Sequence, residues 1–499
     1  MDILQKYVER FCANDEELYK NLIDNAHAYE WLQGEIPLFE CPDVTIEETY
    51  YFRYWTYRKH LKKTEEQKYI ITEFLPKVAW SGKYNEINAA VGHHIYEGRW
   101  LKNSFEYLKD YIHFFLDHPE RGHQYSAWMI YAAYQLCVVT GNFDLGEDFL
   151  EKACRYYEEW ERTHLLPNGM FWSYDNYDAM EYSISGTSND LRCLKGIRPT
   201  LNSYMCADAW AIAAFARHAG RTEIGEKYQR KYEEIKTQIN KNLWQNGFYR
   251  AYHFENDNMA ESCQSMIENP VITPPKELIG YIPWMFDIPE AGKEAVFDAL
   301  TDPNCFYTDF GITTADITDK RFLFSVNHEC LWNGYIWPFA ISQTLTAMRN
   351  MLRHYRDTEK YRQDFVDLVK QYAHMHKRIT ENGSVVNWID EVRHPLRDEW
   401  SSREILKARG WKPEYGGYER GKDYNHSTFC DIIISGIVGV EVKNGEITVS
   451  PIIPDTWNYF KLENLYVCGD IYSIFYDKSG EKYHRGKGLN IYKNGQLKG

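Results

Sequence analysis

Apolar residues recur with helical spacing along most of the first 380 positions. Segments such as SFEYLKDYIHFFLD (104–117) and LNSYMCADAWAIAAFARHAG (201–220) carry them at i, i+3, i+4 and i+7, on one face of a helix. Helix pairs follow one another at roughly regular intervals. Their connections are alternately short and long, and the long ones are rich in Trp, Asn, Asp, Gly and Pro. This arrangement predicts a closed ring of helical hairpins with its functional residues in the long loops, although a generic helical array has the same periodicity.

The hydrophobic period changes close to Gly439. The segment VGVEVKNGEITVSP alternates apolar and polar residues around Asn444-Gly445, a dipeptide typical of two-residue hairpin turns. No Pro- or Ser-rich linker separates the two patterns. We therefore expect a catalytic helical domain over residues 1–440, including an N-terminal helical lead-in, and a C-terminal β-hairpin appendage over residues 441–499 that packs on it.

Charge and cysteine usage exclude several classes of partner. The chain of 499 residues has 57 Lys and Arg against 72 Asp and Glu, a net charge of −15, which disfavours nucleic acid. No apolar window is long enough to span a membrane, and the charged first thirty residues argue against a signal peptide. The eleven cysteines are scattered without a CxxC pair. We expect a cytoplasmic chain with reduced thiols, no zinc site and no membrane partner. The oligomeric state is not readable from the sequence.

Aromatic residues are unusually abundant, with 16 Trp, 40 Tyr and 24 Phe. Flat rings stack on the faces of sugar rings, and Tyr and Trp also offer a hydrogen bond. Large hydrophobic cores use the same residues. Composition alone therefore permits a carbohydrate-binding cleft without requiring one.

The first segment with candidate chemistry is AAVGHHIYEGRWLKN (89–103). Arg99 lies beside Trp100 and close to Gly98, and its guanidinium could bind two sugar hydroxyls or a carboxylate. The alternative is a buried ion pair with Glu97 among core histidines. We expect no metal site on the adjacent histidine pair, although Glu97 lies four residues after His93.

The second segment is NGMFWSYDNYDAMEYSISG (168–186). Asp175, Asp178 and Glu181 lie in an aromatic loop next to Trp172. Apolar walls disfavour the charged form of a carboxyl group, so its pKa rises towards the value that a general acid needs near neutral pH. Solvated loop acids or helix caps are the alternative.

The third segment is NGSVVNWIDEVRHPLRDEW (382–400), in which Asp390 and Glu391 follow Trp388. A second carboxylate in a distant loop would complete the pair of acids that a glycosidase needs. Two tryptophans in HECLWNGYIWPF (328–339), Trp332 and Trp337, are candidate platforms for a sugar ring, or core aromatics at a helix end.

The order and residue patterns of these segments resemble the bacterial (α/α)6-barrel glycosidases around glycoside hydrolase family 63. That group includes trehalases and the mannosylglycerate and glucosylglycerate hydrolases. Asp178-Ala179-Met180-Glu181 is similar to the family's acid motif, and the segment from Glu391 to Pro395 matches the base motif in spacing. CLWNGYIWP resembles the Trp-x-Gly-x-Ile-Trp-Pro segment, and RPTLNSYM (198–205) resembles the loop before the next inner helix. The resemblance covers roughly residues 50–440.

The resemblance implies a mainly α fold with an (α/α)6 barrel and hydrolysis with inversion. Glu181 would be the general acid and Glu391 the general base, with Asp178 as a rival acid. The chain departs from the pattern by Glu instead of Asp at the acid and by Ala179 instead of Gly. About 25 residues, 401–425, are inserted before the final helix, so the family's sugar preference does not transfer.

These observations predict an exo-acting inverting α-glycosidase, α-glucosidase-like, that acts on short oligosaccharides or small glycosides without a cofactor or metal ion. Its predicted substrate-binding residues are Arg99, Trp100, Trp172, Asn202, Trp332, Trp337, Trp388 and His426. One alternative is a sugar epimerase or isomerase on the same barrel, using histidines from the set His93, His94, His328 and His426. A non-catalytic sugar-binding protein is another.

Overall fold

Six inner helical segments of the described chain form a closed ring in the computed structural model, which describes residues 2–254 and 273–498. Each packs against the next and the last closes on the first. In order they are α4 (Val91–Gly98), α7 (Met129–Thr140), α9 (Pro199–His218), η3 (Leu278–Phe286), α12 (Pro338–His354) and α15 (Phe429–Asp431), which continues as the π-helical turn η8 (Ile432–Ile437).

Outer helices cover this ring, and their sequences explain why. They are α5 (Ser104–Asp117), α8 (Phe149–His164), α10 (Thr222–Asn242), η4 (Glu294–Leu300), α13 (Arg362–Met375) and α3 (Val44–His60). Helices α5, α8, α10 and α13 bury one face and expose the other, whereas α9 and α12 are buried on nearly every side. Alternation of inner and outer helices confirms the mainly α, (α/α)6 barrel.

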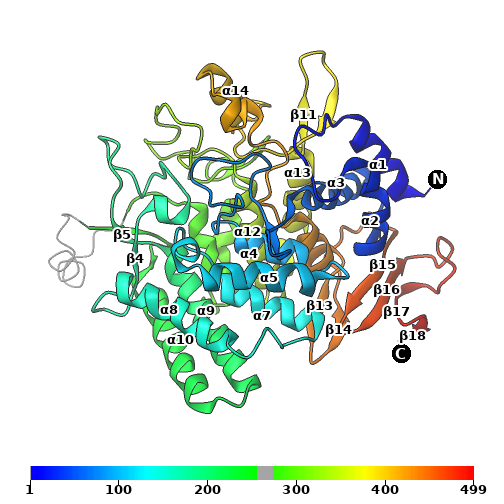
Figure 1. Ribbon diagram of the computed structural model, residues 1–499, viewed down its shortest axis with the longest axis horizontal. Coiled ribbons are helices and arrows are strands. Elements are labelled where there is room, and N and C mark those ends of the chain that lie inside the picture. The colour runs from blue at the N-terminus through cyan, green and yellow to red at the C-terminus, as the bar shows by residue number, and fades with distance from the viewer. Residues whose placement is uncertain (1, 255–272, 499) are drawn as a thin grey trace.

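A five-stranded antiparallel sheet follows the barrel and lies beside it at the right of Figure 1. Its order is β1 (Leu38–Glu40), β15 (Tyr459–Val467), β16 (Asp470–Asp477), β17 (Gly488–Lys493) and β18 (Gln496–Leu497). Strand β1 comes from the N-terminal lead-in, so the sheet joins the two ends of the chain. The domain boundary at residue 440 stays a prediction.

The hairpin predicted at Asn444-Gly445 is confirmed. Strands β13 (Val440–Lys443) and β14 (Glu446–Val449) pair across Asn444 and Gly445, which have φ of 51° and 78°. Two successive positive φ values are those of a type I′ turn, for which Asn-Gly is well suited.

The inserted segment 401–425 folds as α14 (Ser401–Ala408) and two 3₁₀ turns, η6 (Pro413–Tyr415) and η7 (Gly417–Glu419). In Figure 1 it lies at the top of the molecule, at the edge that also carries β11 (Lys377–Ile379). Asp390 anchors the segment, because Ser402 Oγ donates a 2.8 Å hydrogen bond to its Oδ1. Gly421 passes so close that a Cβ there would lie 2.0 Å from the same oxygen. Among the described residues, no helix is long and apolar enough to cross a bilayer.

Candidate active site

A cavity of about 270 Å³ opens at the end of the barrel where the inner helices begin. Its walls come from loops that precede α4, α7, α9, α12 and α15. Such loops are long and aromatic, as the sequence pattern predicted. The lining residues are Glu73, Phe74, Trp80, Ile87, Ala89, Tyr125, Ala179, Glu181, His328, Glu329, Cys330, Trp332, Trp337, Phe339, Glu391, Arg420 and Tyr424.

Glu181 enters this cavity from the loop before α9. Its backbone oxygen accepts a 3.1 Å hydrogen bond from the N–H of Trp332, and the Cys330 thiol donates to its Oε2 at 2.9 Å. Burial raises the pKa of Glu181 to about 7, although the thiol hydrogen bond opposes the rise. Close to neutral pH this carboxyl group can therefore carry a proton and release it.

Glu391 lies in the same cavity but has a cationic partner. Arg420 Nη2 donates to Glu391 Oε2 at 3.0 Å, and Arg420 Nη1 lies 3.0 Å from Glu329 Oε1. Burial raises the pKa of Glu391, and the Arg420 guanidinium opposes that rise. Of the two predicted carboxyls, only Glu391 has a guanidinium at hydrogen-bond distance, so it is the one held towards its ionised form.

A third carboxyl group, Glu73, was missed by the sequence analysis. It lies in the loop between β3 (Tyr69–Ile71) and α4, and Tyr424 OH donates a hydrogen bond to its Oε1. Burial raises the pKa of Glu73 to about 8 despite that hydrogen bond, and the neighbouring Glu391 and Glu181 add to the rise. The only sequence signal was one acid within TEFLPKVAW, among apolar and aromatic residues.

The aromatic walls include the two tryptophans that were predicted as sugar platforms. Trp332 and Trp337 stack on each other with ring centroids 4.5 Å apart and planes at 17°. Trp337 Nε1 donates to the Leu331 carbonyl at 2.7 Å, which holds its ring in place. Both side chains line the cavity.

Asp178, the rival acid, does not line the cavity. Arg198 Nε donates to its Oδ2 at 2.6 Å, Thr200 donates to the same oxygen, and Ser126 Oγ donates to Oδ1 at 2.7 Å. Both carboxylate oxygens therefore have partners, which tie the loop to the start of α9 through Oδ2 and to the loop before α7 through Oδ1. Asn202 also holds the loop and does not line the cavity. Its Oδ1 accepts from the Phe171 N–H at 2.8 Å, and its Nδ2 donates to the Phe171 carbonyl at 2.9 Å.

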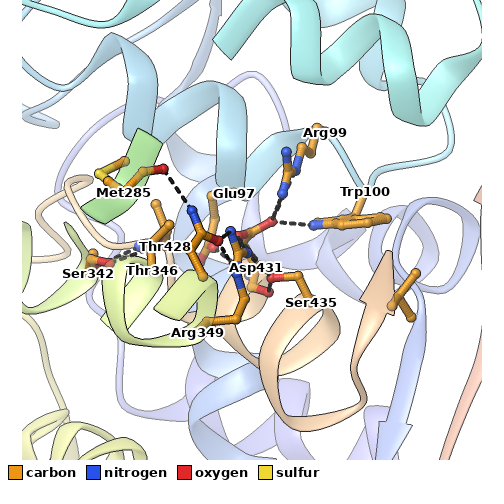
Figure 2. Close-up of polar contacts among 12 residues, drawn as sticks. Glu97, Arg99, Trp100, Met285, Ser342, Thr346, Arg349, Thr428, Asp431 and Ser435 are labelled. Atoms are coloured by element: carbon orange, nitrogen blue, oxygen red, sulfur yellow. Dashed lines mark hydrogen bonds and ion pairs between the residues drawn. The ribbon is translucent and has the colours of Figure 1, made fainter. Parts of the chain in front are cut away.

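Arg99 and Trp100 lie outside the cavity, in contrast to the expectation that they contact sugar. They follow the C-terminus of α4, whereas the cavity is formed around its N-terminus. Figure 2 shows both side chains on Asp431: Arg99 Nη2 donates at 2.6 Å and Trp100 Nε1 at 2.7 Å, both to Oδ1. Arg349 of α12 reaches Oδ2 at 3.3 Å. This buried cluster joins three inner helices, α4, α12 and α15.

The other predicted contacts also lie away from the cavity wall. Trp172 is half-buried and stacks on His164 at 4.6 Å. The Arg378 guanidinium lies 4.2 Å from the centroid of the Trp388 ring. Trp388 lines a separate depression of the surface. His426 is buried directly behind the wall, where its ring meets Tyr424 at 3.8 Å.

Three of the four candidate histidines, His93, His94 and His426, are at most 1% exposed and do not line the cavity. Burial lowers the pKa of His93 and of His94 to about 3, and lowers that of His426 well below its usual range. Only His328 of that set lines the cavity. In the chain that the structure describes, no group of three or more His, Cys, Asp or Glu side chains is arranged to hold a metal ion.

Comparisons with known proteins place this geometry in a family. The family model for the mannosylglycerate hydrolase MGH1-like glycoside hydrolase domain matches residues 83–427. A solved structure named Sialidase is 34% identical, with a TM-score of 0.86; the match covers 99% of this chain and 43% of that chain. This chain thus spans less than half of that protein's length.

More distant structures share the fold alone. The α-L-rhamnosidase of Streptomyces avermitilis, solved with L-rhamnose, is 11% identical with a TM-score of 0.54, over 92% of this chain and 37% of that one. The α-L-rhamnosidase of Dictyoglumus thermophilum is 12% identical with a TM-score of 0.52, over 89% and 43%. The family model spans the loops that supply most of the cavity, and the chain belongs to the mannosylglycerate hydrolase MGH1-like glycoside hydrolase family.

Proposed function

We propose that this chain is an exo-acting inverting α-glycosidase in which Glu181 is the general acid and Glu391 the general base. One observation carries the proposal: the two carboxyls line one cavity and have different polar partners. Glu181 has a thiol as its neighbour, and Glu391 has the Arg420 guanidinium. Pairs of titratable groups whose surroundings separate their pKa values are typical of acid–base sites.

In this scheme Glu181 gives its proton to the glycosidic oxygen as the bond to the anomeric carbon breaks. Glu391 takes a proton from a water molecule whose oxygen bonds to that carbon from the opposite face. Both carboxyls return to their starting states by exchanging protons with solvent. No covalent intermediate forms, and the configuration at the anomeric carbon inverts.

The size of the cavity supports action on small glycosides. About 270 Å³ lies just below the range of pockets that enclose drug-sized ligands and is room for about one or two sugar units. The stacked pair Trp332–Trp337 forms an apolar wall on which a sugar ring can pack. Action in the cytoplasm stays a prediction from the cysteine pattern.

An epimerase or isomerase is the less favoured alternative, because the cavity has one histidine at its wall rather than a pair. A non-catalytic sugar-binding protein would not need one carboxyl group with a pKa of about 7 and another held by a guanidinium.

The proposal is tested with a panel of α-glucosides, α-mannosides and α-L-rhamnosides, incubated with the wild type, Glu181→Gln and Glu391→Gln. Proton NMR of the first product should show the β-anomer from an α-glycoside. Glu391→Gln should retain sugar binding and lower kcat by several orders of magnitude. An α-anomer as first product would refute inversion, and full activity of Glu391→Gln would refute the base assignment.

A further inference from the structure

We infer that the cavity selects uncharged glycosides and rejects substrates that carry a carboxylate. The inference rests on the proposed function and names its substrate class. It departs from what the family description suggests, because mannosylglycerate is a carboxylate-bearing glycoside.

Carboxyl groups dominate the polar lining of the cavity. Glu73, Glu181, Glu329 and Glu391 all line it, and none of the lining residues is a lysine. Arg420 is the one guanidinium at the wall that the described residues form. A bound carboxylate would need a cationic partner here, and Arg420 is the candidate.

The charge of Arg420 is already compensated inside the protein. Its two terminal nitrogens each lie 3.0 Å from a carboxylate oxygen, one on Glu391 and one on Glu329. The side chain is only 2% exposed, and its guanidinium lies between Trp80 and Trp411 at 4.8 and 4.9 Å from their ring centroids. Its Nε and Nη1 lack a hydrogen-bond partner among the described residues, but a ligand carboxylate would have to compete with Glu391 and Glu329 for this one guanidinium.

Glu329 is held ionised by its surroundings. Burial works against ionisation, but Arg420 and His328 outweigh it and the pKa of Glu329 is lowered. Arg409, which directly follows α14 in the inserted segment, makes a second ion pair with it. A carboxylate-bearing substrate would therefore approach two carboxyl groups that are already paired, Glu391 with Arg420 and Glu329 with Arg420 and Arg409, and it would meet no unpaired guanidinium at the wall that the described residues form. Like charges brought together in a desolvated site strongly disfavour binding.

A neutral sugar meets no such opposition. Its hydroxyl groups can donate hydrogen bonds to the ionised carboxylates, which only accept. Glu73, protonated at neutral pH, can donate one to a sugar oxygen. The polar lining of this cavity is therefore matched to hydroxyl groups.

The experiment compares substrates that differ only by a carboxylate, each with the wild type and with Glu329→Gln. Suitable pairs are a 4-nitrophenyl α-glucoside with the α-glucuronide, and an α-mannosyl glycerol with the α-mannosyl glycerate. The wild type should prefer the neutral member by about a hundredfold or more in kcat/KM. Glu329→Gln leaves Arg420 with a single carboxylate, so this preference should fall by about tenfold or more. The matched control Glu381→Gln removes an exposed carboxylate that pairs with Lys407 and should leave the ratio unchanged.

Equal or faster hydrolysis of the carboxylate-bearing member by the wild type would overturn the inference while leaving the proposed hydrolase intact. Tryptophan fluorescence of the protein measures the binding of free glucose, mannose, glucuronate and glycerate, and this measurement separates the remaining outcomes. If no glycoside is hydrolysed but only the neutral sugars bind, the proposed function fails and the inference stands. If glucuronate or glycerate binds as tightly as the neutral sugars, or if none of the four binds, the inference fails.

Discussion

Arg420 Nη2 donates a 3.0 Å hydrogen bond to Glu391 Oε2, although the two residues belong to different structural segments. Glu391 lies in the loop that follows β12 (Val385–Asn387), and Arg420 comes from the insertion 401–425. Asp390 links these segments, since it accepts hydrogen bonds from the Glu391 N–H and from Ser402 Oγ. The insertion therefore supplies the cation that faces the proposed base.

Replacing Arg420 should change the pH dependence of catalysis. Without the guanidinium, Glu391 and Glu329 repel each other and the pKa of Glu391 rises further, so Glu391 stays protonated to higher pH. In Arg420→Met the acidic limb of kcat/KM should move to higher pH, with a lower maximum. Arg420→Lys, which keeps the charge, should show a smaller shift. The profile is measured on one α-glycoside between pH 4 and pH 9.

The charge-matched control is Lys407→Met, which removes an exposed cation of the same insertion. It should leave the acidic limb in place. If Arg420→Met folds and keeps the wild-type profile, Arg420 does not act on the base.

Glu181 should set the alkaline limb. Its pKa is about 7, and a general acid must be protonated, so activity on ordinary glycosides should fall as the pH rises above about 7. A glycosyl fluoride needs little protonation of its leaving group. With that substrate the alkaline limb should flatten, and Glu181→Gln should retain most of its activity. If Asp178→Asn shows this dependence on the leaving group and Glu181→Gln does not, the acid is Asp178.

Arg99 should affect stability rather than substrate binding. Arg99→Met leaves the buried Asp431 with Arg349, at 3.3 Å, as its remaining cationic partner beside the Trp100 hydrogen bond, and breaking a buried ion pair costs about 3–5 kcal/mol. Denaturant unfolding measures this loss. Lys227→Met, which breaks an exposed pair with Glu158, should cost about 1 kcal/mol or less. A stable Arg99→Met variant with a raised KM would restore the sugar-binding role.

The architecture and the two principal carboxyls could be predicted because local patterns carry them. Helical periodicity determines which faces are buried, and Glu181 and Glu391 lie in motif-like segments within long loops. Arg99 was misplaced for a geometric reason. A guanidinium beside Trp100 and Gly98 suggested a sugar contact, but the eight residues of α4 span about 12 Å and carry Arg99 to the far end of the helix from the cavity.

Glu73 and Arg420 could not be assigned from local patterns. Glu73 is a single acid in a loop, and its partner Tyr424 lies 351 positions away. The insertion was recognised as a feature that reshapes the cleft, but its contact with the base depends on how Asp390 anchors it. Such contacts arise from tertiary folding and leave no spacing in the sequence.

Ala179 occupies a backbone conformation that favours glycine. Its φ and ψ are 55° and 40°, in the left-handed region, where a Cβ costs about 1–2 kcal/mol. Ala179→Gly removes that strain, while the more flexible unfolded chain offsets part of the gain. The unfolding free energy of Ala179→Gly should therefore lie between that of the wild type and a value about 1 kcal/mol higher. The control Ala214→Gly, inside helix α9, should lower the unfolding free energy by about 1 kcal/mol. Equal losses at both sites would refute the argument.

Glu73 should make stability fall as the pH rises. Its pKa is about 8 in the folded state against an ordinary value of 4.5, so between these values the folded chain holds a proton that the unfolded chain has released. The unfolding free energy that this group contributes therefore decreases as the pH rises. The stabilisation from Glu73 is fully present below pH 4.5 and is lost as the pH rises past about 8. Glu73→Gln, a neutral isostere, removes the dependence. Its Tm relative to the wild type should therefore be higher at pH 8 than at pH 5, as measured by calorimetry. The control Glu65→Gln, at an exposed pair with Lys83, should show no such trend, and a Tm difference for Glu73→Gln that is constant with pH would show that Glu73 ionises normally.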